Sequence, residues 1–376
     1  MPPSSSPYQD GRSIRFRLIS LEEWWSEKEG DDLHSDIQSE RRPRCLLDLR
    51  PQDAFDSCRL EHSSLVTVCI PFNVLRSRSF ELPARHVEFS VLLEDGNVEA
   101  LETAESFLLG GRPPSEKSRK LPQRPWMVRY AMLANAGFWN QAQALGIQST
   151  ETAQQQFPFP RLWQPDSMVQ DVLLPALRQL TIPRGNHQRT KMQILDLASG
   201  SARDAAFLAE ELLASPSERD FMVVALDQRY NEKEGNIVTD FFRRRQVDGV
   251  SKWIRMDLAR WSNVKEWLLA AYEREQDFTN YHCTFLCVRF WKRSLVEALA
   301  EDTNVAAGTL FATSHFCKPH VGAKWKFEHP NEKNVLERNE LVKIFSRNNM
   351  WLILHDQIAL DSDHGRTMIH FLAKRL

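Results

Sequence analysis

The sequence has no long apolar run, no closely spaced cysteine pair and no excess of charge of either sign. No apolar run reaches the roughly 18 residues that a membrane-spanning helix needs, so we expect no membrane partner. The formal net charge of −2 gives no long-range attraction to nucleic acid. No basic stripe with interleaved aromatic residues predicts a nucleic-acid groove either. These absences leave small molecules and other proteins as the expected partners.

The six cysteines are scattered through the chain without a C-x-x-C pair. We therefore predict neither a zinc site nor a disulfide framework. Cys283 and Cys287 lie in one apolar run, where buried structural thiols are expected. The N-terminus has no apolar core of signal-peptide length. We expect a reducing, cytoplasmic setting; the alternative is an organelle transit peptide, which Arg12, Arg15 and Arg17 would suit.

A chain of 376 residues is too long for one average domain, so we expect two. The Pro/Ser-rich residues 1–12 are expected to be disordered. The first domain is expected over 13–150, a proline-containing linker over 151–165, and the second domain over 166–376. Within the first domain, Gly110–Pro125 is rich in Gly, Pro and basic residues, which predicts either a surface insertion or a basic binding loop.

The first domain resembles a known family over most of its length. Its buried strand ends in a D-x-R motif, followed by an acid-Phe pair, a histidine and an Ile-Pro pair. The residues in those places are Asp48, Arg50, Asp53, Phe55, His62, Ile70 and Pro71. Further on, HVEFSVLL (86–93) predicts a second strand, and 130–139 carries a strand, a glycine turn and a tryptophan. This pattern resembles a rhodanese-like domain, which implies an α/β fold.

The loop after the HVEFSVLL strand departs from that family. A working rhodanese carries a nucleophilic cysteine there, whose thiolate is stabilised by backbone N–H groups. Here the loop is Glu94–Glu99, which has three acids and no cysteine, while Cys58 and Cys69 belong to other elements. We therefore expect no sulfurtransferase activity, although that remains an alternative function. The domain is expected to pack against or recognise a partner, including another protein.

The second domain alternates regularly between strand and helix patterns. The expected strands are 191–197, 220–227, 252–258, 282–290 and 308–316, followed by a closing pair at 350–360 and 366–376. Helical patterns separate the first five strands, which implies right-handed crossovers and a mostly parallel sheet covered on both faces. The last two strands would join as an antiparallel hairpin. We therefore predict a Rossmann-like, mostly parallel seven-stranded sheet.

A turn of small residues follows the first of these strands and opens into a helix. Acids end the second and third strands, and short motifs follow in order. They are Asp196, Gly200, Arg203 and Asp204; Asp227; Asp257; Val288–Phe290 with Arg293; Gly308; and Gly365–Arg366. In this order they resemble the class I S-adenosylmethionine-dependent methyltransferases, most closely the tellurite-resistance and thiopurine type. The resemblance implies S-adenosyl-L-methionine as the cofactor and a small-molecule methyl acceptor.

The resemblance also implies roles for individual residues. The backbone at Ala198, Ser199 and Gly200 would approach the methionine part of the cofactor, and Asp196 would hold the turn or the cofactor ammonium. The expected cofactor set is completed by Arg203, Asp227 for the ribose hydroxyls, Asp257 for the adenine amino group, and Val288. The alternative for each aspartate is an ordinary strand-end or N-cap residue.

Two glycines of the family pattern are replaced by Ala198 and Ala202, so a site that has lost its cofactor is an alternative. In that case the protein would be a non-catalytic scaffold with two degenerate domains. Arg243–Arg245 lie late in a predicted helix, where we interpret them as a solvated face that complements the helix dipole.

The expected acceptor is a small thiol, amine or soft anion. The fourth strand ends without an Asn/Asp-Pro-Pro-aromatic motif, which argues against a nucleobase or glutamine amide. Methyl transfer to a small acceptor needs mainly in-line positioning and exclusion of water. His315 is the best candidate for contact with the acceptor, with Arg289 beside it, although a histidine on an apolar strand can equally be structural. Segment 317–334, which contains Lys324–Lys326, would cover an anionic acceptor or be a solvated loop.

Overall fold

The computed structural model describes residues 15–30, 43–110, 125–150, 158–180, 191–215, 220–274, 282–360 and 365–376. The expectation of disorder over 1–12 and nearly all of the Gly110–Pro125 segment fall outside these residues. The chain forms two compact units, Met1–Gln164 and Pro165–Leu376. No helix in the described part is long and apolar enough to cross a membrane.

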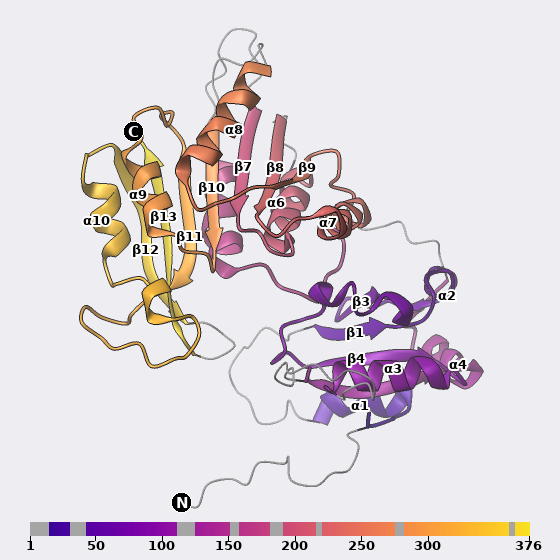
Figure 1. The fold of residues 1–376 in the computed structure, drawn as a ribbon. Coiled ribbons are helices and arrows are strands. Elements are labelled where there is room, and N and C mark those ends of the chain that lie inside the picture. Colours follow the sequence, from indigo (N-terminus) through magenta and orange to yellow (C-terminus); the bar gives the residue numbers. More distant parts are fainter. Residues whose placement is uncertain are drawn as a thin grey trace, which may run out of the picture. The chain divides into compact units, whose positions relative to one another are not determined.

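The first unit contains a four-stranded parallel sheet of order β3-β1-β4-β5 (Figure 1). Its central strands are apolar on both faces, because helices and loops bury each side. The strands are β1 (Arg44–Asp48), β3 (Leu65–Cys69), β4 (Phe89–Glu94) and β5 (Val128–Ala134), with a short antiparallel pair β2 (Arg59–Leu60) and β6 (Gln148–Ser149). The helices are α1 (Leu21–Gly30), α2 (Gln52–Ser57), α3 (Val98–Leu108) and α4 (Ala136–Ala144).

A buried ion pair lies at the carboxyl end of β1. Arg50 Nη2 donates to Asp48 Oδ2 at 2.7 Å, and the two side chains are 5% and 0% exposed. The guanidinium also donates to the Cys58 carbonyl and lies 4.7 Å from the centre of the Trp139 ring. The D-x-R sequence motif therefore joins β1, α2 and α4 as a structural pair.

The second unit is built on a seven-stranded sheet of order β12-β13-β11-β10-β7-β8-β9. The five strands from β9 to β11 pair in parallel, and β13 pairs antiparallel with both β11 and β12. The strands are β7 (Lys191–Leu197), β8 (Asp220–Asp227), β9 (Ser251–Arg255), β10 (His282–Val288), β11 (Leu310–Phe316), β12 (Trp351–Leu360) and β13 (Thr367–Arg375). The expected mostly parallel sheet with a closing antiparallel hairpin is confirmed.

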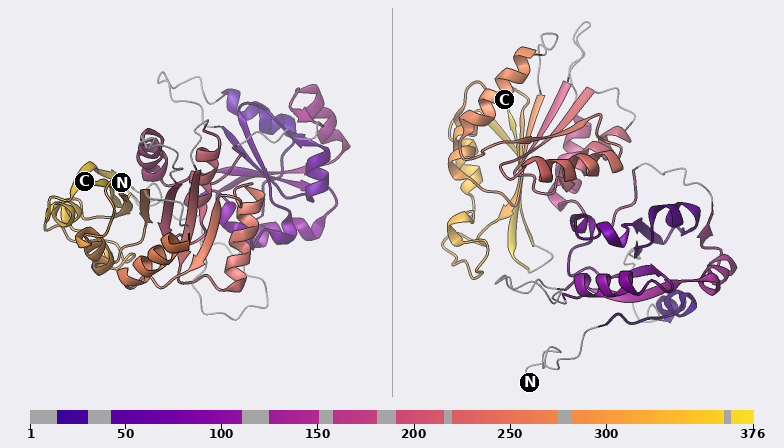
Figure 2. Two further views of the ribbon diagram at one scale, coloured as in Figure 1. Left: turned by 90° about the horizontal axis from the view of Figure 1, so that it is seen from above. Right: turned by 45° about the vertical axis from the view of Figure 1, so that its right-hand side comes forward.

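Helices cover both faces of this sheet (Figures 1 and 2). One apolar core joins β7, β8, β10 and β11 to three helices through side chains such as Leu268, Leu295 and Phe345. The helices are α5 (Leu174–Gln179), α6 (Arg203–Leu213), α7 (Glu232–Arg244), α8 (Trp261–Arg274), α9 (Arg293–Glu301) and α10 (Glu340–Ser346), and a π-helical turn, η4 (Met168–Leu173), precedes α5. Because both faces are covered, ligands can approach the central strands mainly at their ends.

Arg245 corrects one sequence interpretation. Arg243 and Arg244 are exposed, as expected, but Arg245 is only 6% exposed. Its Nη2 donates to Glu210 Oε2 of α6 at 2.7 Å, and its Nε donates to Glu210 Oε1. The partner is 35 residues away in the chain, so no local pattern could reveal it. This pair joins α6 to the end of α7.

Removing one partner of this buried pair should destabilise the protein strongly. We expect Glu210→Leu to lower the free energy of unfolding by about 3 kcal/mol or more, because Arg245 loses its counter-ion in the interior. The double variant Glu210→Leu/Arg245→Met should recover most of that loss. Urea unfolding of the full chain measures both changes.

The control is Asp240→Ala, which breaks the exposed Arg243–Asp240 pair. It should cost less than about 1 kcal/mol. A loss for Glu210→Leu as small as that of the control would contradict the interpretation that burial makes this pair matter.

Candidate functional site

The turn between β7 and α6 is built from residues in an unusual backbone conformation. Ala198, Gly200 and Ala202 each have a φ of 59°. This left-handed region suits glycine but is costly for alanine, whose Cβ crowds the backbone. Ala202 immediately precedes α6 and caps it without a side-chain hydrogen bond. The turn thus keeps the backbone conformation that glycine favours, although alanine occupies two of its three left-handed positions.

The turn after β8 lies against this first turn. Gly200 N–H donates to Asp227 Oδ2 at 3.0 Å, and Ser199 N–H donates to the Leu226 carbonyl at 3.1 Å. Ser199 Oγ is also within 2.7 Å of the hydroxyl of Tyr230, which is 2% exposed. These hydrogen bonds hold together the carboxyl ends of β7 and β8.

Both carboxylate oxygens of Asp227, at the end of β8, accept hydrogen bonds. Its Oδ1 accepts a hydrogen bond from Arg229 N–H at 2.8 Å, and the Arg229 guanidinium donates to both of its oxygens. Burial alone would raise the pKa of Asp227, but the hydrogen bonds from Arg229 and Gly200 outweigh burial and lower it. Asp227 is therefore an ionised carboxylate at neutral pH.

The pKa values of Asp196 and Asp204 are shifted in the opposite direction to that of Asp227. Burial, together with the charges of Asp204 and Asp227, raises the pKa of Asp196 well above its usual value. Burial and the charge of Asp166 raise the pKa of Asp204 to about 6, and Asp204 accepts a hydrogen bond from Asp166 N–H at 2.9 Å. Asp196 in β7 and Asp204 in the first turn of α6 are thus two acids that favour a proton or a cation.

Asp257 differs from the other acids. It is exposed, lies two residues beyond the end of β9, and accepts a hydrogen bond from Ala259 N–H in its own loop at 2.9 Å. The Asp257 carbonyl accepts a second bond from the Asn263 side chain. These contacts are those of a loop-capping residue, and they leave the carboxylate accessible to solvent.

The end of β10 brings Val288 and Arg289 to the same edge of the sheet. Val288 is paired in register with Ser314 of β11, and Arg289 N–H donates to the Ser314 carbonyl at 2.7 Å. Arg289 has a φ of 54°, and its charge lowers the pKa of Asp204 against the larger effect of burial. Its guanidinium lies 6.0 Å from the centre of the Phe316 ring. Arg289 therefore acts electrostatically on the start of α6.

His315 is a buried neutral imidazole. It is 2% exposed, its Nε2 lies 2.6 Å from the Asn334 carbonyl, and its ring is stacked on Trp291 at 6.2 Å. Because a carbonyl only accepts, Nε2 carries the proton and Nδ1 is left as an acceptor. Burial lowers the pKa of His315 to about 4. Nδ1 and Trp291 Nε1 are both buried without a partner among the described residues.

Sequence reasoning missed Arg229 and Tyr230, which lie two and three residues after Asp227. Asp204 was matched to the family motif but given no role in the site. The available signal was position, since a residue that follows a strand-ending acid lies at the same sheet edge. Arg203 is half-buried at the start of α6, and its charge lowers the pKa of Asp204.

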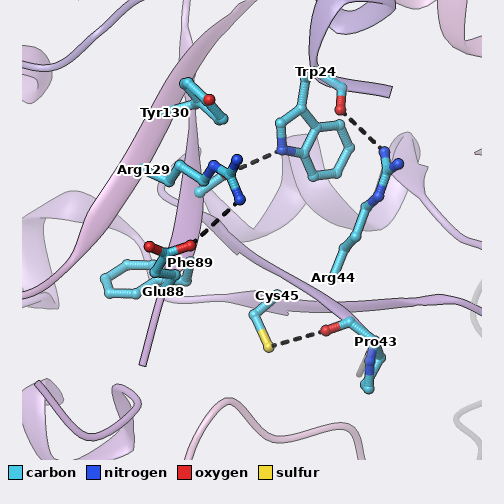
Figure 3. A pocket seen from close by; sticks show the side chains of 9 residues that line it. Trp24, Pro43, Arg44, Cys45, Glu88, Phe89, Arg129 and Tyr130 are labelled. Carbon is cyan, nitrogen blue, oxygen red and sulfur yellow. Dashed lines mark hydrogen bonds and ion pairs between the residues drawn. The ribbon is translucent and has the colours of Figure 1, made fainter. Parts of the chain in front are cut away.

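In the first unit, a cavity of about 70 Å³ lies beside α1 and the amino ends of β1, β4 and β5 (Figure 3). Its polar side chains pair with one another. Trp24 Nε1 donates to Ser90 Oγ, Arg44 donates to the Trp24 carbonyl, and Arg129 pairs with Glu88 at 3.4 Å. These contacts join α1 to the strands β1 and β4 beside the cavity. The described part of the chain holds no cluster of three or more potential metal ligands.

No protein family's sequence profile matches the chain, and no curated protein matches it. Among solved structures it is similar to the [4+2]-cyclase SpnF, with 10% identity, 54% of this chain and 79% of that one covered, and a TM-score of 0.35. It is also similar to a Burkholderia thailandensis 1,6-didemethyltoxoflavin-N1-methyltransferase solved with S-adenosylhomocysteine. The identity is 12%, the match covers 49% of this chain and 70% of that one, and the TM-score is 0.31. A third similar structure is a 16S ribosomal RNA adenine methyltransferase from Catenulisporales acidiphilia, with 13% identity, 49% of this chain and 85% of that one covered, and a TM-score of 0.31. Similarity at this level carries no argument about what this chain binds.

Replacing Ala198 by glycine should relieve backbone strain. We expect Ala198→Gly to leave the free energy of unfolding unchanged or to raise it by up to ~1 kcal/mol. The left-handed conformation strains alanine, and relief of this strain should at least offset the extra conformational entropy that glycine loses on folding. Urea unfolding provides the measurement. Ala205→Gly, at a buried position inside α6, is the control and should lose about 1 kcal/mol. Equal losses in both variants would show that strain at Ala198 is not significant.

Proposed function

We propose that the second unit is an S-adenosyl-L-methionine-dependent methyltransferase that acts on a small molecule. The observation that carries the proposal is the pair of bridged turns at the carboxyl ends of β7 and β8, where Gly200 N–H meets the Asp227 carboxylate at 3.0 Å. In a doubly wound sheet, nucleoside-like ligands bind at that edge, where small-residue turns allow close approach to the backbone. The sheet order and the ordered motifs of the sequence support it further.

In this proposal each residue type has a task in cofactor binding. The ribose hydroxyls bind Asp227, and the methionine part lies along Ala198, Ser199 and Gly200. Its ammonium is attracted by Asp196 and Asp204, the two acids whose burial makes a cation favourable. The cofactor supplies the reactive methyl group on a sulfonium ion, and the protein supplies orientation and exclusion of water.

Three further residues complete the proposed cofactor site. Asp257 accepts a hydrogen bond from the adenine amino group, Val288 contacts the cofactor from the end of β10, and Arg203 supports the start of α6. The exposed carboxylate of Asp257 is compatible with that contact. Because Asp257 is anchored only within its own loop, its contribution to affinity should be smaller than that of Asp227.

The acceptor is proposed to bind near His315 and Arg289. A neutral imidazole with a free Nδ1 accepts a hydrogen bond, so it suits an acceptor that carries a hydroxyl, thiol or amine proton. Arg289 adds a positive charge at the same sheet edge. Trp325 folds back within the segment after β11, donating to the Pro330 carbonyl at 2.9 Å. We propose that this segment covers the acceptor.

The first unit is proposed to be a rhodanese-like domain without catalytic function. The turn after β4 contains Asp95, Gly96 and Asn97, and Asn97 caps α3 by accepting a hydrogen bond from Ala100 N–H. No thiol is available there. Cys69 is buried, its pKa is raised by burial, and its Sγ donates to the Arg50 carbonyl. A role in packing or in recognition of a protein partner remains for this unit.

Cofactor binding tests the proposal directly. Titration calorimetry with S-adenosylhomocysteine should show one site per chain. Gly200→Val should abolish binding, because a β-branched side chain at a φ of 59° strains the turn and would fill the face of the turn along which the cofactor is proposed to lie. Asp227→Ala should weaken binding about tenfold or more, since a charged acceptor of two hydrogen bonds is lost. Absence of any binding to the folded wild-type protein would reject the proposal in favour of a scaffold.

Cofactor affinity should depend on pH through Asp204. Its pKa of about 6 means that a proton competes with the cofactor ammonium below that pH. Affinity should therefore be highest above pH 7 and fall as the pH drops from 7 to 5, by up to about tenfold per unit below pH 6. Calorimetry at several pH values measures this, with Asp204→Asn as the control that flattens the profile. A flat wild-type profile would contradict the assigned charge state.

A further inference from the structure

The Asp227 carboxylate is oriented by two backbone N–H groups before any side chain contributes. Gly200 N–H donates to Oδ2 at 3.0 Å, and Arg229 N–H donates to Oδ1 at 2.8 Å. Both bonds persist whatever the side chain at position 229 is doing. The position of this carboxylate is therefore set mainly by the backbone of the two turns.

The Arg229 guanidinium then occupies the remaining outward side of the same carboxylate. Its Nε lies 3.2 Å from Oδ1 and its Nη2 lies 3.1 Å from Oδ2. A methyl group built on Gly200 would come within 3.3 Å of this Nη2. The guanidinium thus lies over the bare face of Gly200, where close approach of a ligand is needed.

We propose that Arg229 is a displaceable gate that holds the Asp227 carboxylate until a vicinal diol, such as that of a ribose, takes its place. The proposal rests on the proposed function and adds the residue that competes for the nucleoside site. A diol and a guanidinium edge each donate two hydrogen bonds to two carboxylate oxygens, so one can replace the other.

The structure explains why this arginine can leave. Its side chain is 70% exposed, whereas that of Asp227 is 4% exposed. An arginine side chain that is this exposed is held weakly, because water and salt compete for its guanidinium and the long side chain loses freedom in forming the pair. Once the guanidinium swings into solvent, the backbone bonds keep the carboxylate in place for the diol.

The test measures the affinity of adenosine, an uncharged diol-bearing probe, and of S-adenosylhomocysteine by calorimetry. Arg229→Ala should bind both about two- to fivefold more tightly than the wild type, which corresponds to removing one exposed ion pair. Arg229→Lys keeps the charge but loses the two-pronged geometry, so its affinity should be intermediate.

The matched control is Arg255→Ala. Arg255 is exposed at the end of β9 and is the register neighbour of Asp227, so its removal deletes the same charge at the same sheet edge. It should leave adenosine affinity within about twofold of the wild type. Added salt gives a second readout, because it should tighten adenosine binding to the wild type and have no such effect on Arg229→Ala.

The possible outcomes distinguish a failure of the gate proposal from a failure of the proposed function. Unchanged or weaker binding by Arg229→Ala, with a binding-competent wild type, overturns the gate and leaves the proposed function standing. An equal gain in Arg255→Ala also overturns it, because the effect would then be one of overall charge. If neither the wild type nor any folded variant binds either probe, the proposed function fails as well.

Discussion

The contact between Gly200 and Asp227 is the interaction on which the candidate site depends. It joins two turns that are 27 residues apart in the chain and fixes the carboxyl ends of β7 and β8 relative to one another. The turn makes this contact with three of its residues in the left-handed region, two of them alanines. Geometry that is costly locally is thus maintained by the sheet, the buried Tyr230 and the start of α6.

The central strands β7, β8, β10 and β11 were predictable because they are buried on both faces and therefore read as continuous apolar runs. The KMQILDL and DFMVVALD runs correspond to β7 and β8 at the same residues. The end of the third strand was less accurate, since β9 stops at Arg255 and Asp257 belongs to the following loop. The short run around Trp253 is only partly buried, and a weak pattern fixes a boundary poorly.

What the sequence could not predict depends on partners distant in the chain. The burial of Arg245 follows from Glu210 on another helix, and the neutral state of His315 follows from the Asn334 carbonyl and the rings around it. Arg229 is only two residues from Asp227, but its hydrogen bonds to that carboxylate could not be predicted without the geometry of the turn. Residue identities thus indicated where the acids would lie, whereas their charge states required the three-dimensional surroundings.

The two kinds of acid at this edge balance their charge by different means. Asp227 is ionised and compensated by a guanidinium, whereas burial raises the pKa values of Asp196 and Asp204, so these two acids keep their protons up to a higher pH. Binding of a cationic ligand would therefore be an exchange in which protons leave the protein and enter the buffer. The heat measured for such an event includes the ionisation enthalpy of the buffer, so it should differ between phosphate and Tris even when the affinity is the same.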